Sequence, residues 1–289
     1  MPQTVFITGC SPGGIGNALA REYHARGCHV IASARRPDAL TDLADLGIDT
    51  LLLDVDSHAS VARAVAEVAA LAGGRLDVLV NNAGSTYVMP LADVDLQQVR
   101  ALFETNVFAV VHLTNQLLPL LIEARGLVVN ISSAAESLAF PFKGAYAMTK
   151  AAIASYSRTL SVEVAPLGVR VLNVTTAFIQ SQLGKRHPPP AWPADSLYDS
   201  MRAVGQKAGS GTRMTPQVYA QTVVSESLRG PGYEIGPWRW GGTRETLMLG
   251  TLSGPMWVLG FLGSNWARFV MLRMWKFSIL TDALSKKNV

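Results

Sequence analysis

The stretch that decides the fold is TVFITGCSPGGIG, residues 4–16, an apolar run followed by a glycine-rich turn and the start of a helical pattern. Consecutive apolar residues without alternation are typical of a strand covered by helices on both faces. Glycines permit a tight turn and let backbone N–H groups approach a pyrophosphate at the positive end of the following helix. Because the turn lies between the first strand and the first helix, it predicts a dinucleotide site at Gly9, Ser11, Gly14 and Gly16.

From Thr4 to Thr176, short apolar runs alternate with polar turns and longer amphipathic stretches. This alternation predicts βαβ units and a mostly parallel sheet. Strands are expected at Thr4–Thr8, His29–Ala34, Thr50–Leu53, Asp77–Asn81, Leu127–Ser132 and Val169–Thr175, with a seventh near Tyr233–Ile235. Helices are expected at Ile15–Ala25, Ser57–Leu71, Asp95–Ala124 and Ala145–Pro166, the third bent or interrupted at Pro119. The pattern predicts one α/β domain with a doubly wound parallel sheet.

The composition excludes several classes of protein. The 289 residues are 49% hydrophobic and 16% charged, which excludes a disordered chain, and two cysteines exclude a disulfide framework and favour a reducing compartment. The net charge is +4, but residues 1–228 hold 17 basic and 18 acidic side chains, whereas 229–289 hold 8 and 3. We therefore expect no nucleic-acid partner. The first residues show no signal-peptide pattern, so a cytoplasmic protein is expected.

Two arginines follow the second expected strand, where an acidic residue normally holds the 2′-hydroxyl of a dinucleotide ribose. Ala34-Arg35-Arg36 offers two guanidinium groups and no carboxylate. Guanidinium groups pair well with phosphate. We therefore expect NADP(H) rather than NAD(H) as the cofactor, with solvated loop charges as the alternative explanation.

Further motifs follow the later strands. They are Asp54-Val55, Asn81-Asn82-Ala83-Gly84, Asn106-Val107, Asn130-Ile131-Ser132-Ser133 and Tyr146-Ala147-Met148-Thr149-Lys150. In this order and spacing, over roughly residues 3–181, the chain resembles the short-chain dehydrogenase/reductase family. Over its whole length it is most similar to the fungal acyl-dihydroxyacetone-phosphate reductase branch, near the hydroxysteroid and retinol dehydrogenases. The resemblance implies a Rossmann fold and an NADP-dependent oxidoreductase that forms homo-oligomers.

The resemblance implies a catalytic tetrad of Asn106, Ser133, Tyr146 and Lys150. Tyr146 and Lys150 are four residues apart, so a helix places them on one face. We expect the Lys150 ammonium to lower the pKa of the Tyr146 phenol from its ordinary value of about 10. In the family this lysine also holds the nicotinamide ribose. Ser133, with Ser132 as the fallback, would donate a hydrogen bond to the substrate carbonyl oxygen, and Asn106 would hold a water that connects Lys150 with solvent.

The resemblance also implies cofactor contacts. Ile15 backs the phosphate loop, Asp54 and Val55 meet the adenine, Asn82 and Gly84 line the adenosine ribose, and Ile179 and Ser181 reach the nicotinamide amide. The chain departs from the family in two places. The interval from Gly9 to Gly14 is one residue longer than usual, so Pro12 or Gly13 is expected to bulge, and Thr176-Ala177 replaces the usual Pro-Gly. We assign no residue as a metal ligand.

Residues 184–216 are rich in proline and small polar residues, which predicts a mobile lid over the site. Within it, Lys185, Arg186 and His187 could meet a phosphate or carboxylate of the substrate, with solvated loop charges as the alternative. Such a lid would exclude water from the site.

An apolar, basic C-terminal extension, residues 246–289, follows the domain expected over residues 1–245. No charged residue occurs from Thr246 to Ala267, and Arg268, Arg273 and Lys276 then follow among aromatic residues. Three interpretations stay open: a membrane span, which its length permits but its glycines oppose; a helical anchor at a membrane surface; or apolar helices that cover the substrate entrance or a subunit interface.

Together these observations predict an NADPH-dependent reductase that transfers hydride to the ketone of a large lipophilic substrate, with Tyr146 as proton donor. The substrate would be an acyl-dihydroxyacetone phosphate, a steroid-like ketone or a polyketide-type intermediate. The alternatives are NADP-dependent oxidation of a secondary alcohol and a non-catalytic dinucleotide-binding scaffold at a membrane. Besides the cytoplasm, the surface of the endoplasmic reticulum or of lipid droplets is an alternative location.

Overall fold

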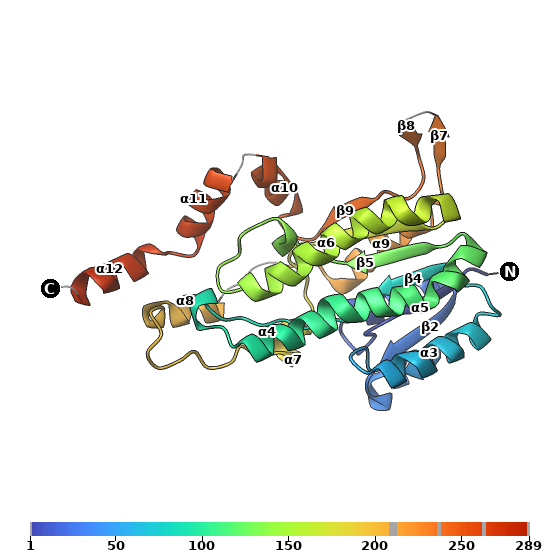
Figure 1. Ribbon diagram of the computed structural model, residues 1–289, viewed down its shortest axis with the longest axis horizontal. Helices are drawn as coiled ribbons and strands as arrows, with labels where there is room; N and C mark the ends of the chain where they lie inside the picture. The colour runs from blue at the N-terminus through green and yellow to red at the C-terminus, as the bar shows by residue number, and fades with distance from the viewer. Residues whose placement is uncertain (1, 208–212, 236–237, 262–263, 288–289) are drawn as a thin grey trace.

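A seven-stranded parallel sheet forms the centre of the computed structural model, which describes residues 2–207, 213–235, 238–261 and 264–287 (Figure 1). The strand order is β3-β2-β1-β4-β5-β6-β9. The strands are β1 (Thr4–Ile7), β2 (His29–Ala34), β3 (Asp49–Leu52), β4 (Val78–Asn81), β5 (Leu127–Ile131), β6 (Arg170–Thr176) and β9 (Thr246–Leu249). All neighbouring pairs are parallel, so the carboxyl ends of the strands share one edge. The predicted doubly wound α/β sheet is confirmed.

Helices cover both faces of this sheet. One layer consists of α1 (Ile15–Ala25), α2 (Thr41–Ala44) and α9 (Pro216–Ser227), and the other of α3 (His58–Leu71), α5 (Ala109–Ala124) and α6 (Gly144–Val164), which Figure 1 shows on the near side. Ile7 packs into the first layer and its neighbour Phe6 into the second. Because successive side chains of a strand point to opposite faces, both must be apolar, which explains the continuous apolar runs in the sequence.

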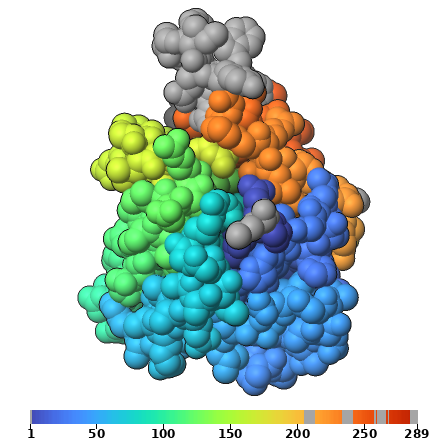
Figure 2. All heavy atoms as spheres, turned by 90° about the vertical axis from the view of Figure 1, so that its right-hand side faces the viewer, coloured from blue at the N-terminus to red at the C-terminus, as the bar shows by residue number. Residues whose placement is uncertain are grey.

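The loops that lead into the strands lie at the end of the sheet opposite its carboxyl edge. Figure 2 shows this end of the molecule. There the blue N-terminal residues lie beside the orange residues that follow α9. The hydroxyls of Tyr23 on α1 and Ser227 on α9 form a buried hydrogen bond of 2.6 Å. This bond joins segments that are 204 residues apart and fixes the first helical layer.

The long helix expected over Asp95–Ala124 is interrupted, but not at Pro119. It consists of α4 (Leu96–Phe103), a π-helical turn (Glu104–Phe108) and α5, and Pro119 lies inside α5. A π turn accommodates an extra residue in a helix and often occurs at functional sites. Within the described residues, Leu96–Ala124 is the one helix long and apolar enough to cross a membrane, and α5 buries its apolar face against the sheet.

The strand predicted near Tyr233–Ile235 is confirmed as β7, but it lies outside the main sheet, where it pairs antiparallel with β8 (Trp238–Trp240). The seventh strand is β9, whose residue Leu247 is buried beside β6. A short uncharged run fits a strand or a helix equally well, so its periodicity could not distinguish the two. The sheet therefore extends past the boundary expected at residue 245.

Trp192, in the segment expected to form a lid, and Trp275 of the C-terminal extension meet at Phe142. The extension contains α10 (Ser253–Phe261), α11 (Ser264–Met274) and α12 (Ser278–Lys287), and Figure 1 shows α11 and α12 extending away from the sheet. The ring of Phe142 lies 4.9 Å from Trp192 of the lid and 5.6 Å from Trp275 of the extension, measured between centroids. These residues belong to a third apolar cluster. The helices have 9, 11 and 10 residues, whereas a bilayer span needs about 20. The membrane-span interpretation stays a prediction.

Candidate active site

A cleft of about 2080 Å³ lies at the carboxyl edge of the sheet, between the glycine turn and the lid. It gathers most of the residues expected from the sequence. Those that line it are Gly9, Ser11, Gly14, Ile15, Arg35, Arg36, Val55, Asn82, Gly84, Ser133, Tyr146, Lys150, Ile179 and Ser181. Gly16, Asp54 and Asn106 do not line it. The carboxylate of Asp54 instead accepts a hydrogen bond from the backbone N–H of Asp56, at 3.3 Å.

In the glycine turn, the backbone of Gly16 lies very close to the Gly9 carbonyl and to the Asn82 side chain. A Cβ on Gly16 would lie 2.6 Å from the Gly9 carbonyl oxygen and 2.5 Å from Asn82 Nδ2, so only glycine fits there. The Asn82 amide donates to the carbonyl of Thr8 at 2.8 Å, which joins the ends of β1 and β4. The N-terminus of α1 carries no side-chain cap, so its first N–H groups can bind a pyrophosphate. A dinucleotide fits this turn, and Pro12 and Gly13 lie exposed in it, as predicted for the extra residue.

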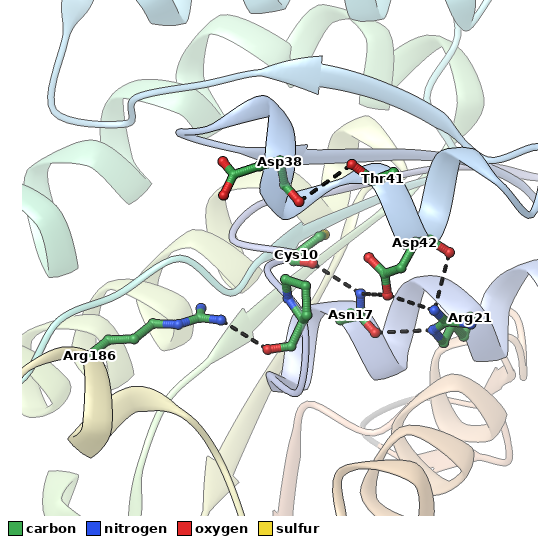
Figure 3. A network of polar contacts seen from close by, with 8 residues as sticks. Cys10, Asn17, Arg21, Asp38, Thr41, Asp42 and Arg186 are labelled. Carbon is green, nitrogen blue, oxygen red and sulfur yellow. Dashed lines mark hydrogen bonds and ion pairs between the residues drawn. The ribbon is translucent and has the colours of Figure 1, made fainter.

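A polar network fixes the turn from behind (Figure 3). Asn17 Nδ2 donates to the Cys10 carbonyl at 3.3 Å and to the Asp42 carboxylate at 3.0 Å, and Arg21 pairs with Asp42 at 2.6 Å. Although burial alone would raise the pKa of Asp42, hydrogen bonds from Arg21 and Asn17 hold it below its ordinary value. The carboxylate therefore stays ionised and holds the turn to α2.

Three guanidinium groups approach one another at the rim of the cleft. Arg35 and Arg36 follow β2, and Arg186 extends from the lid helix α7 (Leu183–Arg186) to donate to the Pro12 carbonyl at 2.9 Å (Figure 3). Burial, followed by the charges of Arg36 and Arg35, lowers the pKa of Arg186. The three positively charged guanidinium groups repel one another, and an anion bound between them would relieve this repulsion.

Ser133, Tyr146 and Lys150 meet where β5 ends and α6 begins. Lys150 Nζ donates to the Ile131 carbonyl at 2.9 Å and lies 5.7 Å from the centroid of the Tyr146 ring. Ser133 lines the cleft beside Tyr146 and opposes the rise of the Tyr146 pKa that burial causes. The three side chains expected to act on a substrate carbonyl therefore lie together in the cleft.

Asn106 lies behind the cleft wall, in the π turn, with 1% of its surface exposed. Its amide donates to the Ser85 carbonyl at 3.0 Å and to Thr149 Oγ1 at 3.1 Å, and its oxygen accepts from the Ser85 N–H at 2.8 Å. These bonds join the loop after β4 to α6, one residue before Lys150. The role of Asn106 in holding a water stays a prediction.

Comparison with known proteins identifies the family. The short chain dehydrogenase family matches residues 3–190. The chain belongs to this family. Short-chain dehydrogenase ptmH of Penicillium ochrochloron is 41% identical over 238 residues, which are 80% of this chain and 86% of that protein. The NADPH-dependent 1-acyldihydroxyacetone phosphate reductase of Schizosaccharomyces pombe is 39% identical over 179 residues, 62% of this chain and 60% of that one. A solved short-chain dehydrogenase from Streptomyces avermitilis has a TM-score of 0.78 at 30% identity and covers 98% of this chain and 99% of its own.

Burial controls the protonation states in this short-chain dehydrogenase. It raises the pKa of Tyr146 to about 12, with the Ser133 hydrogen bond opposing and the charge of Glu136 adding to the shift. The prediction of a lowered Tyr146 pKa was therefore wrong, because removal of the phenol from water outweighs its polar neighbours. Burial also lowers the pKa of Lys150 to about 8, while Glu136 opposes this change. At neutral pH the phenol is protonated and the amine is mostly charged.

Glu136 was missed by the sequence analysis. Its carboxylate accepts from Thr175 Oγ1 at 2.6 Å and from Asn173 Nδ2 at 3.2 Å, which ties the turn after Ser133 to β6. The available signal was an acidic residue three positions after Ser133, in an otherwise apolar segment. Among the residues described, no group of three or more His, Cys, Asp or Glu side chains could hold a metal ion.

The pKa of Lys150 tests this electrostatic arrangement. We expect Lys150 to titrate near pH 8 in NMR spectra of lysine-labelled protein, and Glu136→Gln to lower that pKa because a charge that favours the ammonium is removed. Glu163→Gln, on the exposed part of α6, serves as the control and should leave it unchanged. A Lys150 that titrates at its ordinary value, or a higher pKa in Glu136→Gln, would contradict the arrangement.

Proposed function

We propose that this short-chain dehydrogenase is an NADPH-dependent reductase that transfers hydride to the ketone of a large lipophilic substrate. The observation that carries the proposal is the meeting of Ser133, Tyr146 and Lys150 in the cleft that begins at the glycine turn. Chance pairs of serine and tyrosine have no reason to share a cleft with a dinucleotide turn, which disfavours the non-catalytic scaffold.

The side chains divide the work on the carbonyl. The nicotinamide, when bound, supplies the hydride to the carbonyl carbon. Ser133 donates a hydrogen bond to the carbonyl oxygen, where negative charge develops. Tyr146 gives its phenolic proton to that oxygen, so the product is an alcohol, and the Lys150 ammonium stabilises the phenolate that remains. The Ile131 carbonyl holds Lys150 in place for this step.

The protonation state of Tyr146 favours reduction over the alternative, oxidation of a secondary alcohol. A reductase needs a protonated phenol, whereas oxidation needs a phenolate that accepts a proton. A pKa of about 12 keeps the phenol protonated at neutral pH. The charge of Lys150, with a pKa of about 8, supports the same step below that pH.

The choice of NADP(H) rests on the arginines at the rim of the cleft. Arg35 and Arg36 offer guanidinium groups to a 2′-phosphate, and Arg186 adds a third from the lid. The Schizosaccharomyces pombe relative is named as NADPH-dependent, which agrees with this choice.

A lipophilic substrate is supported by the apolar side chains at the far end of the cleft. Phe140, Phe178 and Met256 line it, and each belongs to or packs against the third apolar cluster. Met256 is on α10, so the extension forms part of the wall. This agrees with the interpretation that the extension covers the substrate entrance.

The proposed setting is the cytoplasm, which agrees with two free cysteines, Cys10 and Cys28.

We also propose that two copies of the chain pair through their long helices. Apolar residues exposed on these helices, such as Phe108 and Val162, support this pairing. Residues 253–280 also expose apolar side chains, with Trp266 59% and Phe269 52% exposed beside Arg268 and Arg273. We propose that this surface contacts anionic membranes.

Replacing the proton donor tests the reaction. Tyr146→Phe should lower the rate of ketone reduction by about 10²–10⁴-fold, since it removes the general acid. NADPH binding should persist, which fluorescence titration would show. Tyr156→Phe, on the same helix but away from the cleft, serves as the control. Equal reduction rates for Tyr146→Phe and the unaltered enzyme would refute the role of Tyr146.

Charge reversal at Arg35 tests the cofactor. Arg35→Asp should weaken NADPH binding by roughly 10- to 100-fold, because a charged hydrogen bond is lost, with a smaller effect on NADH. The dissociation constants of NADPH and of NADH can both be measured by fluorescence titration. Arg63→Asp, exposed on α3, controls for the change in net charge. An unchanged preference for NADPH over NADH would show that Arg35 does not bind the 2′-phosphate.

Two exposed aromatic residues test the membrane contact. The enzyme should float with phosphatidylserine-containing vesicles, and the double variant Trp266→Ser and Phe269→Ser should not, since it removes the apolar side chains that would enter the membrane interface. Leu167→Ser, an exposed apolar residue before β6, is the matched control. Flotation of the double variant to the same extent would rule out this surface as the contact.

A further inference from the structure

Two cationic side chains line the substrate end of the cleft, and the reaction as proposed does not use them. Lys143 immediately precedes α6, and Arg213 immediately precedes Met214. The Met214 N–H donates to the Phe178 carbonyl at 3.3 Å, which places Arg213 beside the segment that follows β6. The Lys143 N–H donates to the Phe140 carbonyl at 3.2 Å.

These contacts bring the two cations toward each other. The rings of Phe140 and Phe178 meet edge to face with centroids 6.0 Å apart, so the two backbone segments that carry Lys143 and Arg213 lie together. Lys143 is also three residues before Tyr146. Residues at that spacing are neighbours at the start of a helix, with Cβ atoms about 5–6 Å apart. Lys143 therefore lies at the same part of the cleft as Tyr146, and Arg213 is the cation beside Lys143.

Lys143 lacks the partner that a partly buried ammonium normally has. In the part of the chain that the structure describes, it forms no ion pair or side-chain hydrogen bond. Burial, and then the charge of Arg213, lowers its pKa. Taking an unpaired cation out of water is unfavourable, and a second cation nearby increases the cost. An anion bound between them would offset it.

Three of the four acidic side chains that line the cleft are engaged elsewhere. Asp93 accepts from Ser196 Oγ at 2.6 Å, and Asp95 accepts from the Gln97 N–H at 2.8 Å, where it caps α4. Asp56 accepts from Thr105 Oγ1 at 2.9 Å. Glu104, the fourth, is exposed at the start of the π turn. None of the four forms an ion pair with Lys143 in the part of the chain that the structure describes. A ligand is therefore the source of an anion for Lys143.

We propose that Lys143 and Arg213 bind an oxyanion of the substrate, a phosphate or a carboxylate, so that the ketone reduced here carries an acidic head group and an apolar tail. This inference rests on the proposed function. The head group lies beside Tyr146, and the tail follows Phe140, Phe178 and Met256 toward the third apolar cluster. A neutral steroid-like ketone would leave the ammonium of Lys143 unpaired.

Matched substrates test the inference. The first pair is a long-chain acyl-dihydroxyacetone phosphate and the same compound without its phosphate, and the second is a long-chain 3-oxo acid and its methyl ester. We expect kcat/KM to be about 10- to 100-fold higher for the acidic member of one pair, mainly through KM, because a charge-assisted contact is gained. The pair that shows the preference distinguishes phosphate from carboxylate.

Variants assign the preference to the two cations. Lys143→Met should abolish it by weakening only the acidic member, Arg213→Met should reduce it, and Lys143→Arg should keep most of it. Arg158→Met, on the exposed part of α6, controls for the loss of a positive charge. NADPH binding by each variant, measured by fluorescence, shows that the cofactor site is intact.

A binding measurement separates this inference from the proposed function. Calorimetry with a long-chain alkyl phosphate and a long-chain fatty acid, each added to the enzyme with NADP⁺, requires no turnover. Binding that Lys143→Met weakens, without reduction of any ketone, would refute the reductase and support the anion site. Reduction of acidic and neutral ketones with equal kcat/KM by the unaltered enzyme and by Lys143→Met would refute the anion site and leave the reductase standing. Neither binding nor reduction would overturn both.

Discussion

The hydrogen bond from Lys150 Nζ to the Ile131 carbonyl is the interaction on which the site depends. It joins α6, which carries Tyr146, to the end of β5, which leads into Ser133. Both groups are buried there, and the burial that fixes them also lowers the pKa of the lysine and raises that of the tyrosine. Glu136 moderates the effect on Lys150, since its negative charge favours the ammonium. A single packing arrangement thus gives the site a neutral phenol and a nearby cation.

Much of this arrangement could be predicted from residues close together in the sequence. The glycine turn, the strand ends and the spacing of Tyr146 and Lys150 each report a local geometry, and the structure places them in one cleft. The pKa of Tyr146 could not be predicted, because desolvation depends on packing from β5, α6 and the lid together. Glu136 was missed for the same reason, since its partners Thr175 and Asn173 are more than thirty residues away.

The end of the chain shows where periodicity fails. The run from Thr246 to Ala267 is uncharged throughout, yet its first part is strand β9 and a later part is helix α10. What separates them is tertiary pairing: β6 offers an open edge that β9 completes, and Gly250, with a φ of +120°, permits the turn that follows. Phe142 then provides the contact for Trp275, which joins the segment between α11 and α12 to the third apolar cluster. The apolar composition of the tail therefore serves at least two purposes: β9 completes the sheet, and Met256 of α10 forms part of the cleft wall.

The net charge of residues 1–228 is close to zero, and this value conceals how their charged side chains are distributed. Residues 1–228 hold nearly equal numbers of basic and acidic side chains, but cations gather at both ends of one cleft. Arg35, Arg36 and Arg186 lie at one end, and Lys143 and Arg213 at the other. Field lines concentrate in such a cleft because its walls have a low dielectric constant, so each group of cations attracts an anion more strongly than it would on an open surface. A dinucleotide phosphate at the first group and an acidic substrate at the second would approach the phenol of Tyr146 from opposite directions. This polarity would orient a long substrate before its carbonyl meets the hydride.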